Sequence, residues 1–254
     1  MTGDADDRDL VVLKLGGSVI TEKEAHETVD EPTLQSAAAA IGSSIDRIDL
    51  LVVHGGGSFG HVHAAAHGVS TTDGSRNREA VAAIHGAMKR LNGAVVDALA
   101  AESVPAVPVH PLSLAARDRN ATLTMGIDGI TRLLSEGFVP VLHGDVIAHE
   151  GRGVTVLSGD EIVTYLAERL RADRLGLCST VPGVLDDDGE VVDVIDDYET
   201  VAPVLGASEA TDVSGGMAGK VRQLLSVGTP ASVFGSESIE PFLRGDTPGT
   251  LIRG

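Results

Sequence analysis

Short runs of Val, Leu and Ile alternate along the chain with longer segments of helical periodicity. The runs lack a regular alternation of apolar and polar residues, which is typical of strands buried on both faces. Because the helical segments lie between the strands, the order resembles repeated strand–helix–strand units. The sequence therefore predicts an α/β fold with a parallel sheet and helices on both of its faces.

The expected elements can be placed by residue number. Strands are expected at 10–15, 49–53, 104–109, 138–143, 174–179, 231–234 and 250–252. Helices are expected at 32–46, 76–101, 126–136, 160–171 and 215–227. The Asp-Gly step within 185–195 suggests a hairpin. No low-complexity linker or repeat interrupts the order, so one continuous domain over 1–254 is expected.

Composition restricts the partners and the compartment. A net charge of −18 disfavours binding to nucleic acid and to anionic membranes. The chain has no apolar run of transmembrane length and no signal-peptide core, and its single cysteine, Cys178, excludes an internal disulfide. These features predict a cytoplasmic protein. The excess of carboxylates with only four lysines suggests a cytoplasm of high salt, which screens the self-repulsion.

Glycine-rich turns follow the expected strands and have the form of anion sites. Glycines let backbone N–H groups approach an anion closely, and a helix that begins after glycines favours negative charge. Three of the four lysines, Lys14, Lys23 and Lys220, lie in or near these turns. The turns are KLGGS (14–18), HGGGSFGH (54–61), HGD (143–145) with the later LSGD (157–160), and DVSGGMAGK (212–220).

The second turn also matches the dinucleotide-binding pattern G-x-G-x-x-G through Gly55, Gly57 and Gly60. That fingerprint requires a second strand ending in an acidic residue about 20 residues later. Asp73 lies at roughly this distance, but it falls in a polar loop with no strand before it. We therefore reject a dinucleotide site. No Walker A motif occurs either.

Three histidines close together, His61, His63 and His67, raise the question of a metal site. Only His63 and His67 share a helix face, and no acidic or cysteine ligand is near them in sequence, so no metal site is expected there. By spacing alone, His61 is either a turn-capping residue or a functional one. Asp160 could likewise be a simple helix N-cap.

The turns contain the groups that phosphoryl transfer needs: backbone cradles for phosphates, lysines, and carboxylates for Mg²⁺ or for orienting the lysines. In this order, the motifs KLGGS, HGGG, SGD, STVPGVL (179–185) and D-x-S-G-G-M-x-x-K resemble the amino acid kinase family, which includes acetylglutamate, aspartate, carbamate and uridylate kinases. The resemblance implies a three-layer αβα sandwich with a mostly parallel sheet. It also implies an acceptor-binding lobe at roughly 1–170, a nucleotide-binding lobe at roughly 171–254, and a homodimer.

Within that family, His61 at the end of GGGSFGH, and Lys23 nine residues after Lys14, resemble the members that phosphorylate isopentenyl phosphate. The expected reaction converts this compound and ATP to isopentenyl diphosphate and ADP, in an archaeal-type mevalonate route. The acceptor phosphate is mostly a dianion at pH 7, so it needs no general base. A histidine that donates to the acceptor would help to bring two anions together.

The resemblance implies a role for each motif residue, with ATP and Mg²⁺ as the cofactors. The implied catalytic residues are Lys14, Lys23, His61 and Lys220; the ATP-binding residues are Lys14, Gly16, Gly17, Ser18, Gly57, Thr180, Asp186, Gly216 and Lys220; and the acceptor-binding residues are Gly56, His61, Asp145, Gly159 and Asp160. Asp145 either contacts the acceptor or orients backbone, and Asp160 either contacts ligand or holds the lysines.

Two alternatives remain open at this point. One is another small-molecule kinase of the family, acting on fosfomycin, acetylglutamate or uridylate; His61 argues against the amino-acid kinases. The other is a nucleotide-binding protein of this fold without turnover, against which the presence of all three motif lysines argues.

Overall fold

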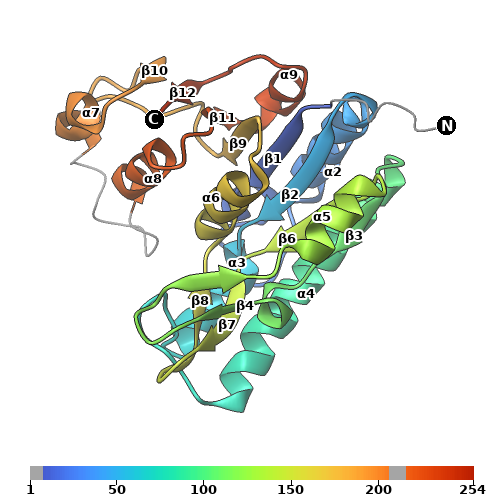
Figure 1. The fold of residues 1–254 in the computed structure, drawn as a ribbon, viewed down its shortest axis with the longest axis vertical. Helices are drawn as coiled ribbons and strands as arrows, with labels where there is room; N and C mark the ends of the chain where they lie inside the picture. Colours follow the sequence, from blue (N-terminus) through green and yellow to red (C-terminus); the bar gives the residue numbers. More distant parts are fainter. Residues whose placement is uncertain (1–7, 206–215) are drawn as a thin grey trace.

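The computed structural model describes residues 8–205 and 216–254 (Figure 1). Residues 212–215, which begin the last glycine motif, lie outside this range. The strands are β1 (Leu10–Leu15), β2 (Asp49–His54), β3 (Ala106–Pro108), β4 (Ala115–Arg117), β5 (Leu123–Met125), β6 (Val139–His143), β7 (Asp145–His149), β8 (Gly153–Leu157), β9 (Arg174–Ser179), β10 (Val194–Ile195), β11 (Ala231–Gly235) and β12 (Thr250–Ile252). The helices are α1 (Gly17–Ile20), α2 (Glu31–Gly42), α3 (Gly57–Ala66), α4 (Arg78–Ala101), α5 (Asp128–Ser135), α6 (Gly159–Leu170), α7 (Tyr198–Leu205), α8 (Gly216–Leu225) and α9 (Ile239–Leu243).

The main sheet has eight strands in the order β10-β12-β11-β9-β1-β2-β6-β3. Every neighbouring pair is parallel except β11 and β12. The first strand of the chain, β1, lies in the middle of the sheet between β9 and β2, so the segment that follows it has neighbours on both sides (Figure 1). This confirms the predicted mostly parallel α/β fold.

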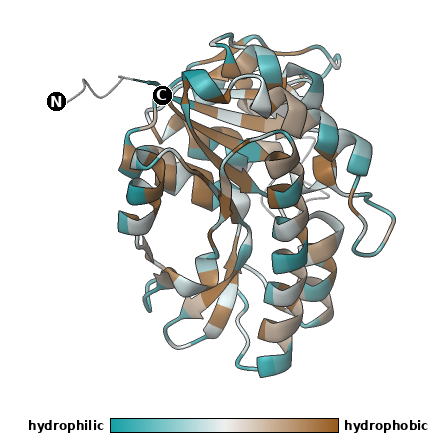
Figure 2. Cartoon of the chain, turned by 90° about the vertical axis from the view of Figure 1, so that its right-hand side faces the viewer, coloured by the Kyte–Doolittle hydropathy of each residue, from teal (hydrophilic) through white to brown (hydrophobic). Residues whose placement is uncertain are grey.

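Helices cover both faces of the main sheet and make it the middle layer of a sandwich. Along β1, Val11 and Leu13 face the core under α2, α4 and α9, whereas Val12 faces the core under α5, α6 and α8. Because successive side chains of a strand point to opposite faces, both sets must be apolar, which explains the unbroken apolar runs. Figure 2 shows hydrophobic residues gathered on the central strands and on the helix sides that face them.

A second sheet, which the sequence did not reveal, extends one end of the molecule. It has the order β5-β4-β7-β8 and lies beside α3 and α4 (Figure 1). Its own small core includes Val69 and Ala80, with Ile84 of α4 and Val146 of β7. Two of its strands have only three residues, too few for a periodicity to be read.

Several predicted boundaries need correction. The helix expected at 32–46 ends at Gly42, and a 3-10 turn occupies Ile45–Arg47. The hairpin expected within 185–195 is present but short: Leu185 and Val191 form an antiparallel bridge, and the Asp186 N–H donates to the Glu190 carbonyl. Val194–Ile195 lie beyond it, as β10, and pair in parallel with β12. No helix in the described ranges is long and apolar enough to cross a membrane.

The chain between α3 and α4 bears on the rejected dinucleotide site. Residues 67–77 contain no strand, and their one bridge joins Ser75 to Val154 of β8. Asp73 lies in this loop, where its carboxylate accepts hydrogen bonds from Ser70 and Thr72. The second strand that would place an acidic residue against a ribose is therefore absent from these residues, as predicted.

Candidate active site at the carboxyl ends of β1 and β2

Two glycine turns meet where β1 and β2 end. The strands are parallel neighbours, so residues 16–17 after β1 lie beside residues 55–57 after β2. A Cβ atom on Gly17 would lie 2.2 Å from the backbone nitrogen of Gly57, and one on Gly55 would lie 2.6 Å from the nitrogen of Gly17. The turns are in direct backbone contact, which only glycine permits. We call these five residues the glycine seam.

Thr21 holds the two sides of the seam together. Its hydroxyl donates to the Gly17 carbonyl at 2.8 Å and accepts from the Ser58 backbone N–H at 3.0 Å. Gly57 adopts a positive φ of 45°, and a Cβ atom there would lie 2.1 Å from the Thr21 hydroxyl oxygen. Thr21 is 2% exposed. Nothing in the sequence singles it out, because threonine in an apolar segment is common.

Lys14 lies on β1 just before the seam and contacts the start of α6. Its Nζ donates to Oδ1 of Asp160 at 2.6 Å, and both side chains are almost buried, at 12% and 13% exposure. A Cβ atom on Gly159 would lie 3.3 Å from Cε of Lys14. The LSGD turn thus approaches the seam through Lys14, and Asp160 holds this lysine in one place.

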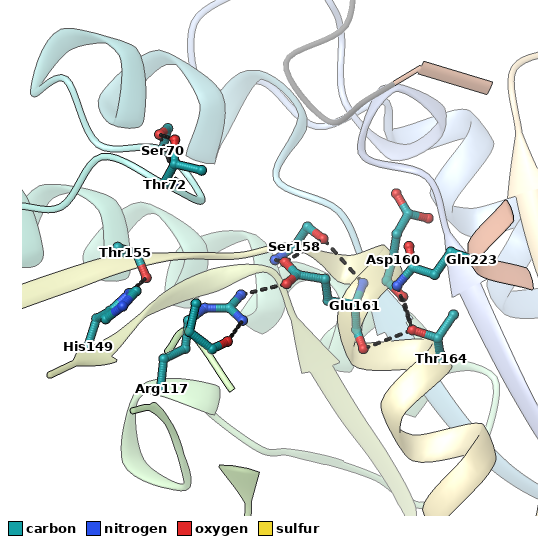
Figure 3. Close-up of polar contacts among 11 residues, drawn as sticks. Ser70, Thr72, Arg117, His149, Thr155, Ser158, Asp160, Glu161, Thr164 and Gln223 are labelled. Carbon is teal, nitrogen blue, oxygen red and sulfur yellow. Dashed lines mark hydrogen bonds and ion pairs between the residues drawn. The ribbon is translucent and has the colours of Figure 1, made fainter. Parts of the chain in front are cut away.

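The start of α6 is fixed by polar contacts that reach the second sheet (Figure 3). Its N-cap is Ser158 rather than Asp160, and Ser158 and Glu161 form a reciprocal capping box. The Glu161 carboxylate also accepts from Nη2 of Arg117 at 2.5 Å, and Arg117, on β4, is buried. The interpretation of Asp160 as an N-cap is therefore wrong, and its carboxylate is directed to Lys14 instead.

Asp145 begins β7, and its side chain is fully buried. Its carboxylate accepts from Nδ1 of His85 at 2.8 Å and from the Val146 backbone N–H at 2.8 Å. Burial raises the pKa of Asp145, and the interaction with His85 opposes that rise. These contacts favour the orienting role over direct contact with an acceptor. His85, on α4, was not identified from the sequence.

Two further histidines lie buried under the seam. His54, the last residue of β2, has its Nε2 3.0 Å from the side-chain amide of Asn92 and its Nδ1 3.1 Å from the Gly55 carbonyl. Burial lowers the pKa of His54 to about 4, and burial with the nearby His54 lowers the pKa of His143 to about 2. Both rings are therefore neutral at pH 7 and add no charge to the seam.

The remaining predicted residues surround the seam to different extents. His61, in α3, is exposed, and its ring lies against the turn, because a Cβ atom on Gly56 would be 3.5 Å from His61 Cδ2. Lys23 is exposed in the hairpin that follows α1. Lys220 is half-buried in α8, which Gly216 begins with a positive φ of 63°.

A pocket of 290 Å³ opens beside the seam at the carboxyl ends of β1, β9 and β11. It brings together Ser18 and Thr180, two residues that the sequence assigned to nucleotide binding. Ser179, Ser236 and Glu237 also line it. Asp186, a third such residue, uses its carboxylate to accept from backbone N–H groups of its own turn, at 3.0 and 2.9 Å.

One group of potential metal ligands occurs in the described ranges, and the sequence did not reveal it. His63 meets Glu27, with its Nε2 2.6 Å from Oε1, and His26 lies next to both. No acidic residue is near these histidines in sequence, but in space Glu27 of the preceding hairpin lies against His63.

The sandwich places glycine turns and an ion-paired lysine at the carboxyl ends of its central strands. This arrangement is typical of the class of α/β proteins that bind phosphate groups at strand ends. The chain belongs to the amino acid kinase family, whose model matches residues 9–229.

Several proteins similar to this chain are isopentenyl phosphate kinases. The isopentenyl phosphate kinase of Haloferax volcanii is 57% identical over 96% of this chain and 99% of its own length, and that of Methanothermobacter thermautotrophicus is 36% identical over 85% and 86%. A solved isopentenyl phosphate kinase structure superposes with a TM-score of 0.80 at 31% identity, covering 96% of this chain and 99% of that one. A solved substrate complex of an isopentenyl phosphate kinase gives 0.77 at 25% identity, covering 96% and 100%.

Proposed function

We propose that this protein transfers the γ-phosphoryl group of ATP to isopentenyl phosphate, giving isopentenyl diphosphate and ADP. The observation that carries the proposal is the glycine seam, where the backbone turns after β1 and β2 lie side by side. Lys14 is fixed next to the seam by Asp160, and His61 follows it in α3. The similarity to isopentenyl phosphate kinases over the whole chain supports the choice of acceptor. The reaction belongs to isoprenoid biosynthesis by an archaeal-type mevalonate route.

The first turn of the seam is assigned to ATP. Gly16, Gly17 and Ser18 would donate backbone N–H groups to its phosphates, and Gly57 would do so from the other side. Thr180 and Ser18 share the neighbouring pocket, which has room for part of the nucleotide. Asp186 and Gly216 are assigned to ATP by family resemblance alone, together with Lys220.

The second turn is assigned to the acceptor, a phosphate monoester that is mostly a dianion at pH 7. Its oxygen is already nucleophilic, so a carboxylate base would only add repulsion. His61 would donate to this phosphate, and the Gly56 N–H would do the same from the turn. Gly159 would face the acceptor from the start of α6, where the helix dipole favours an anion.

Lysines would offset the negative charge that gathers when two phosphates approach. Lys14 needs little rearrangement for this role because Asp160 already fixes its Nζ. Asp160 is in this view a positioning residue for Lys14. Lys23, on the exposed hairpin, would neutralise the group in transfer, and Lys220 would bind the nucleotide from α8.

Mg²⁺ is proposed to arrive with ATP. Within residues 8–205 and 216–254, the one group of three acidic or histidine ligands is His26, Glu27 and His63, and it includes no residue of the seam. A site without such a group still suits Mg²⁺, which is usually held by substrate phosphates, water and one or two carboxylates. The ion would be held mainly by the phosphates and by water, and it would supply charge neutralisation between the phosphates.

The proposal also covers the division into lobes, the compartment and the oligomeric state. We place acceptor binding mainly in residues 1–170 and nucleotide binding mainly in residues 171–254. We also propose a cytoplasmic homodimer, which light scattering after gel filtration would test, since a monomer has half the mass.

The decisive experiment is a coupled ADP-release assay with isopentenyl phosphate, N-acetylglutamate and uridylate in parallel, in Mg²⁺ and high KCl. We expect turnover with the first acceptor and little with the others. Turnover with another acceptor alone would reassign the substrate within the family. ATP binding without turnover on any acceptor would instead indicate a nucleotide-binding protein.

A further inference from the structure

Three side chains that the proposed reaction does not use come together beside the seam. His26 and Glu27 lie in the hairpin 21–29, which the bridge between Thr21 and Val29 closes, and His63 lies on α3. Each of the three offers a ligand atom, and these atoms all lie within 4.8 Å of one another. The rings of His26 and His63 are 5.5 Å apart at their centroids and nearly perpendicular.

We propose that His26, Glu27 and His63 form a binding site for one divalent transition metal ion of the Zn²⁺ class. Two imidazoles and a carboxylate are ligands that suit Zn²⁺, Co²⁺ or Ni²⁺, whereas Mg²⁺ prefers oxygen ligands alone. Three protein ligands leave a fourth, tetrahedral position for water. The site is therefore chemically distinct from that of any Mg²⁺ that enters with ATP.

The geometry needs only small movements to accept the ion. With bonds of about 2.0–2.1 Å, tetrahedral ligand atoms lie about 3.3 Å apart. His63 Nε2 and Glu27 Oε1, now 2.6 Å apart, would separate slightly to admit the metal between them. The His26 side chain is exposed and can turn toward them.

Arg90 supplies the outer support that metal ligands usually have. From α4, its Nε and Nη2 donate to Oε2 of Glu27 at 3.0 and 2.6 Å, and Nη2 also donates to Oε1 at 2.8 Å. A metal would replace the bond to Oε1, while both bonds to Oε2 would keep the carboxylate in place. Glu27 also has a positive φ of 47°, uncommon for this residue type, and its N–H is held by the Ser58 carbonyl.

A bound ion would join two segments that carry proposed catalytic residues. The hairpin 21–29 contains Lys23, and α3 contains His61 two residues before His63. The ion would therefore fix the hairpin against the helix and stabilise the folded protein, since the unfolded chain does not hold the three ligands together.

The test uses the full chain without an affinity tag, in KCl with millimolar Mg²⁺ present throughout. Co²⁺ is titrated and its visible d–d absorption recorded, and Zn²⁺ then competes for the site. We expect one equivalent of Co²⁺ with absorption typical of tetrahedral coordination, displaced by Zn²⁺. The melting temperature should rise with Zn²⁺ and fall back on chelation.

Two histidine variants separate a metal site from a simple ion-pair contact. His26→Ala leaves the Glu27 contacts with His63 and Arg90 in place but should weaken Co²⁺ binding at least tenfold. His67→Ala, at the C-cap of the same helix, should bind like the wild type. No stoichiometric binding, or equal binding by the wild type and His26→Ala, would overturn the proposal. These measurements do not depend on turnover, so failure of the metal site and failure of the proposed reaction can be distinguished.

Discussion

Lys14 and Asp160 are bonded at 2.6 Å, although 146 residues separate them in sequence. The contact joins the central strand of the main sheet to the first turn of α6, and it fixes a positive charge next to the glycine seam. Since both side chains are almost buried, the pair is screened less than a surface ion pair would be. Lys14 is thus held in place before any phosphate arrives.

The Lys14–Asp160 pair predicts a graded loss of activity. Lys14→Met should lower kcat by about 100-fold or more, because it removes a charge directed at the transferring phosphate. Asp160→Asn should lower kcat by about tenfold, since the lysine remains but loses its partner. Both are measured by ADP release at saturating ATP. Lys89→Met, a matched lysine variant in α4, should keep wild-type kcat, and a wild-type kcat in Asp160→Asn would contradict the positioning role.

The glycine seam predicts an unusually sensitive backbone position. Gly17→Ala places a Cβ atom 2.2 Å from the Gly57 nitrogen, so the two turns must separate. We expect loss of most activity and a melting temperature lower by several degrees, as for other changes that strain a buried contact. Gly129→Ala is the control: it lies in α5 with nothing within 4 Å of the added atom, and it should be neutral or slightly stabilising. Retained activity in Gly17→Ala would show that the seam is not needed.

His61 predicts how the acceptor is bound. His61→Ala should reduce kcat/KM for isopentenyl phosphate by about 100-fold while leaving the KM for ATP nearly unchanged, because the donor is lost only on the acceptor side. His61→Gln, which can still donate a hydrogen bond, should recover part of the loss. Steady-state kinetics with each substrate varied separately makes the comparison. An unchanged kcat/KM in His61→Ala would exclude the proposed role.

Much of the main sheet could be predicted because it depends on local patterns. Apolar runs gave β1, β9 and β12 with their observed ends, and the glycine motifs KLGGS and HGGGSFGH meet at the site now described. The second sheet could not be predicted, because three-residue strands such as β4 carry no readable period and are stabilised by neighbours distant in sequence.

The same distinction holds for the site: residues in local motifs could be named from the sequence, whereas contacts between distant segments could not. Lys14 and Asp160 were named from motifs, but their contact across the fold was one of two open alternatives. Thr21 and Arg117 were missed because a buried hydrogen bond leaves no trace in composition or spacing. His63 was noticed, yet its partner Glu27 comes from another segment, so the distance between them in sequence hid their contact.

The acidic composition predicts that salt stabilises the fold. With a net charge of −18, the folded chain repels itself, and raising KCl from about 0.1 M to about 1 M shortens the Debye length from about 10 Å to about 3 Å. The melting temperature should rise steadily over this range, as followed by circular dichroism. A melting temperature that is independent of KCl would argue against adaptation to a high-salt cytoplasm.

The buried His54 predicts a loss of stability in mild acid. Its pKa is about 4 in the folded protein against 6.5 for an ordinary histidine, so between these values the unfolded chain binds a proton that the folded chain does not. Stability present above pH 6.5 should therefore fall as the pH drops toward 4, by about 3 kcal/mol from this group. Urea unfolding at several pH values measures the slope. His54→Gln, though less stable overall, should show a shallower slope over the same range, because that proton is gone; parallel curves for the two proteins would assign the acid sensitivity to other groups.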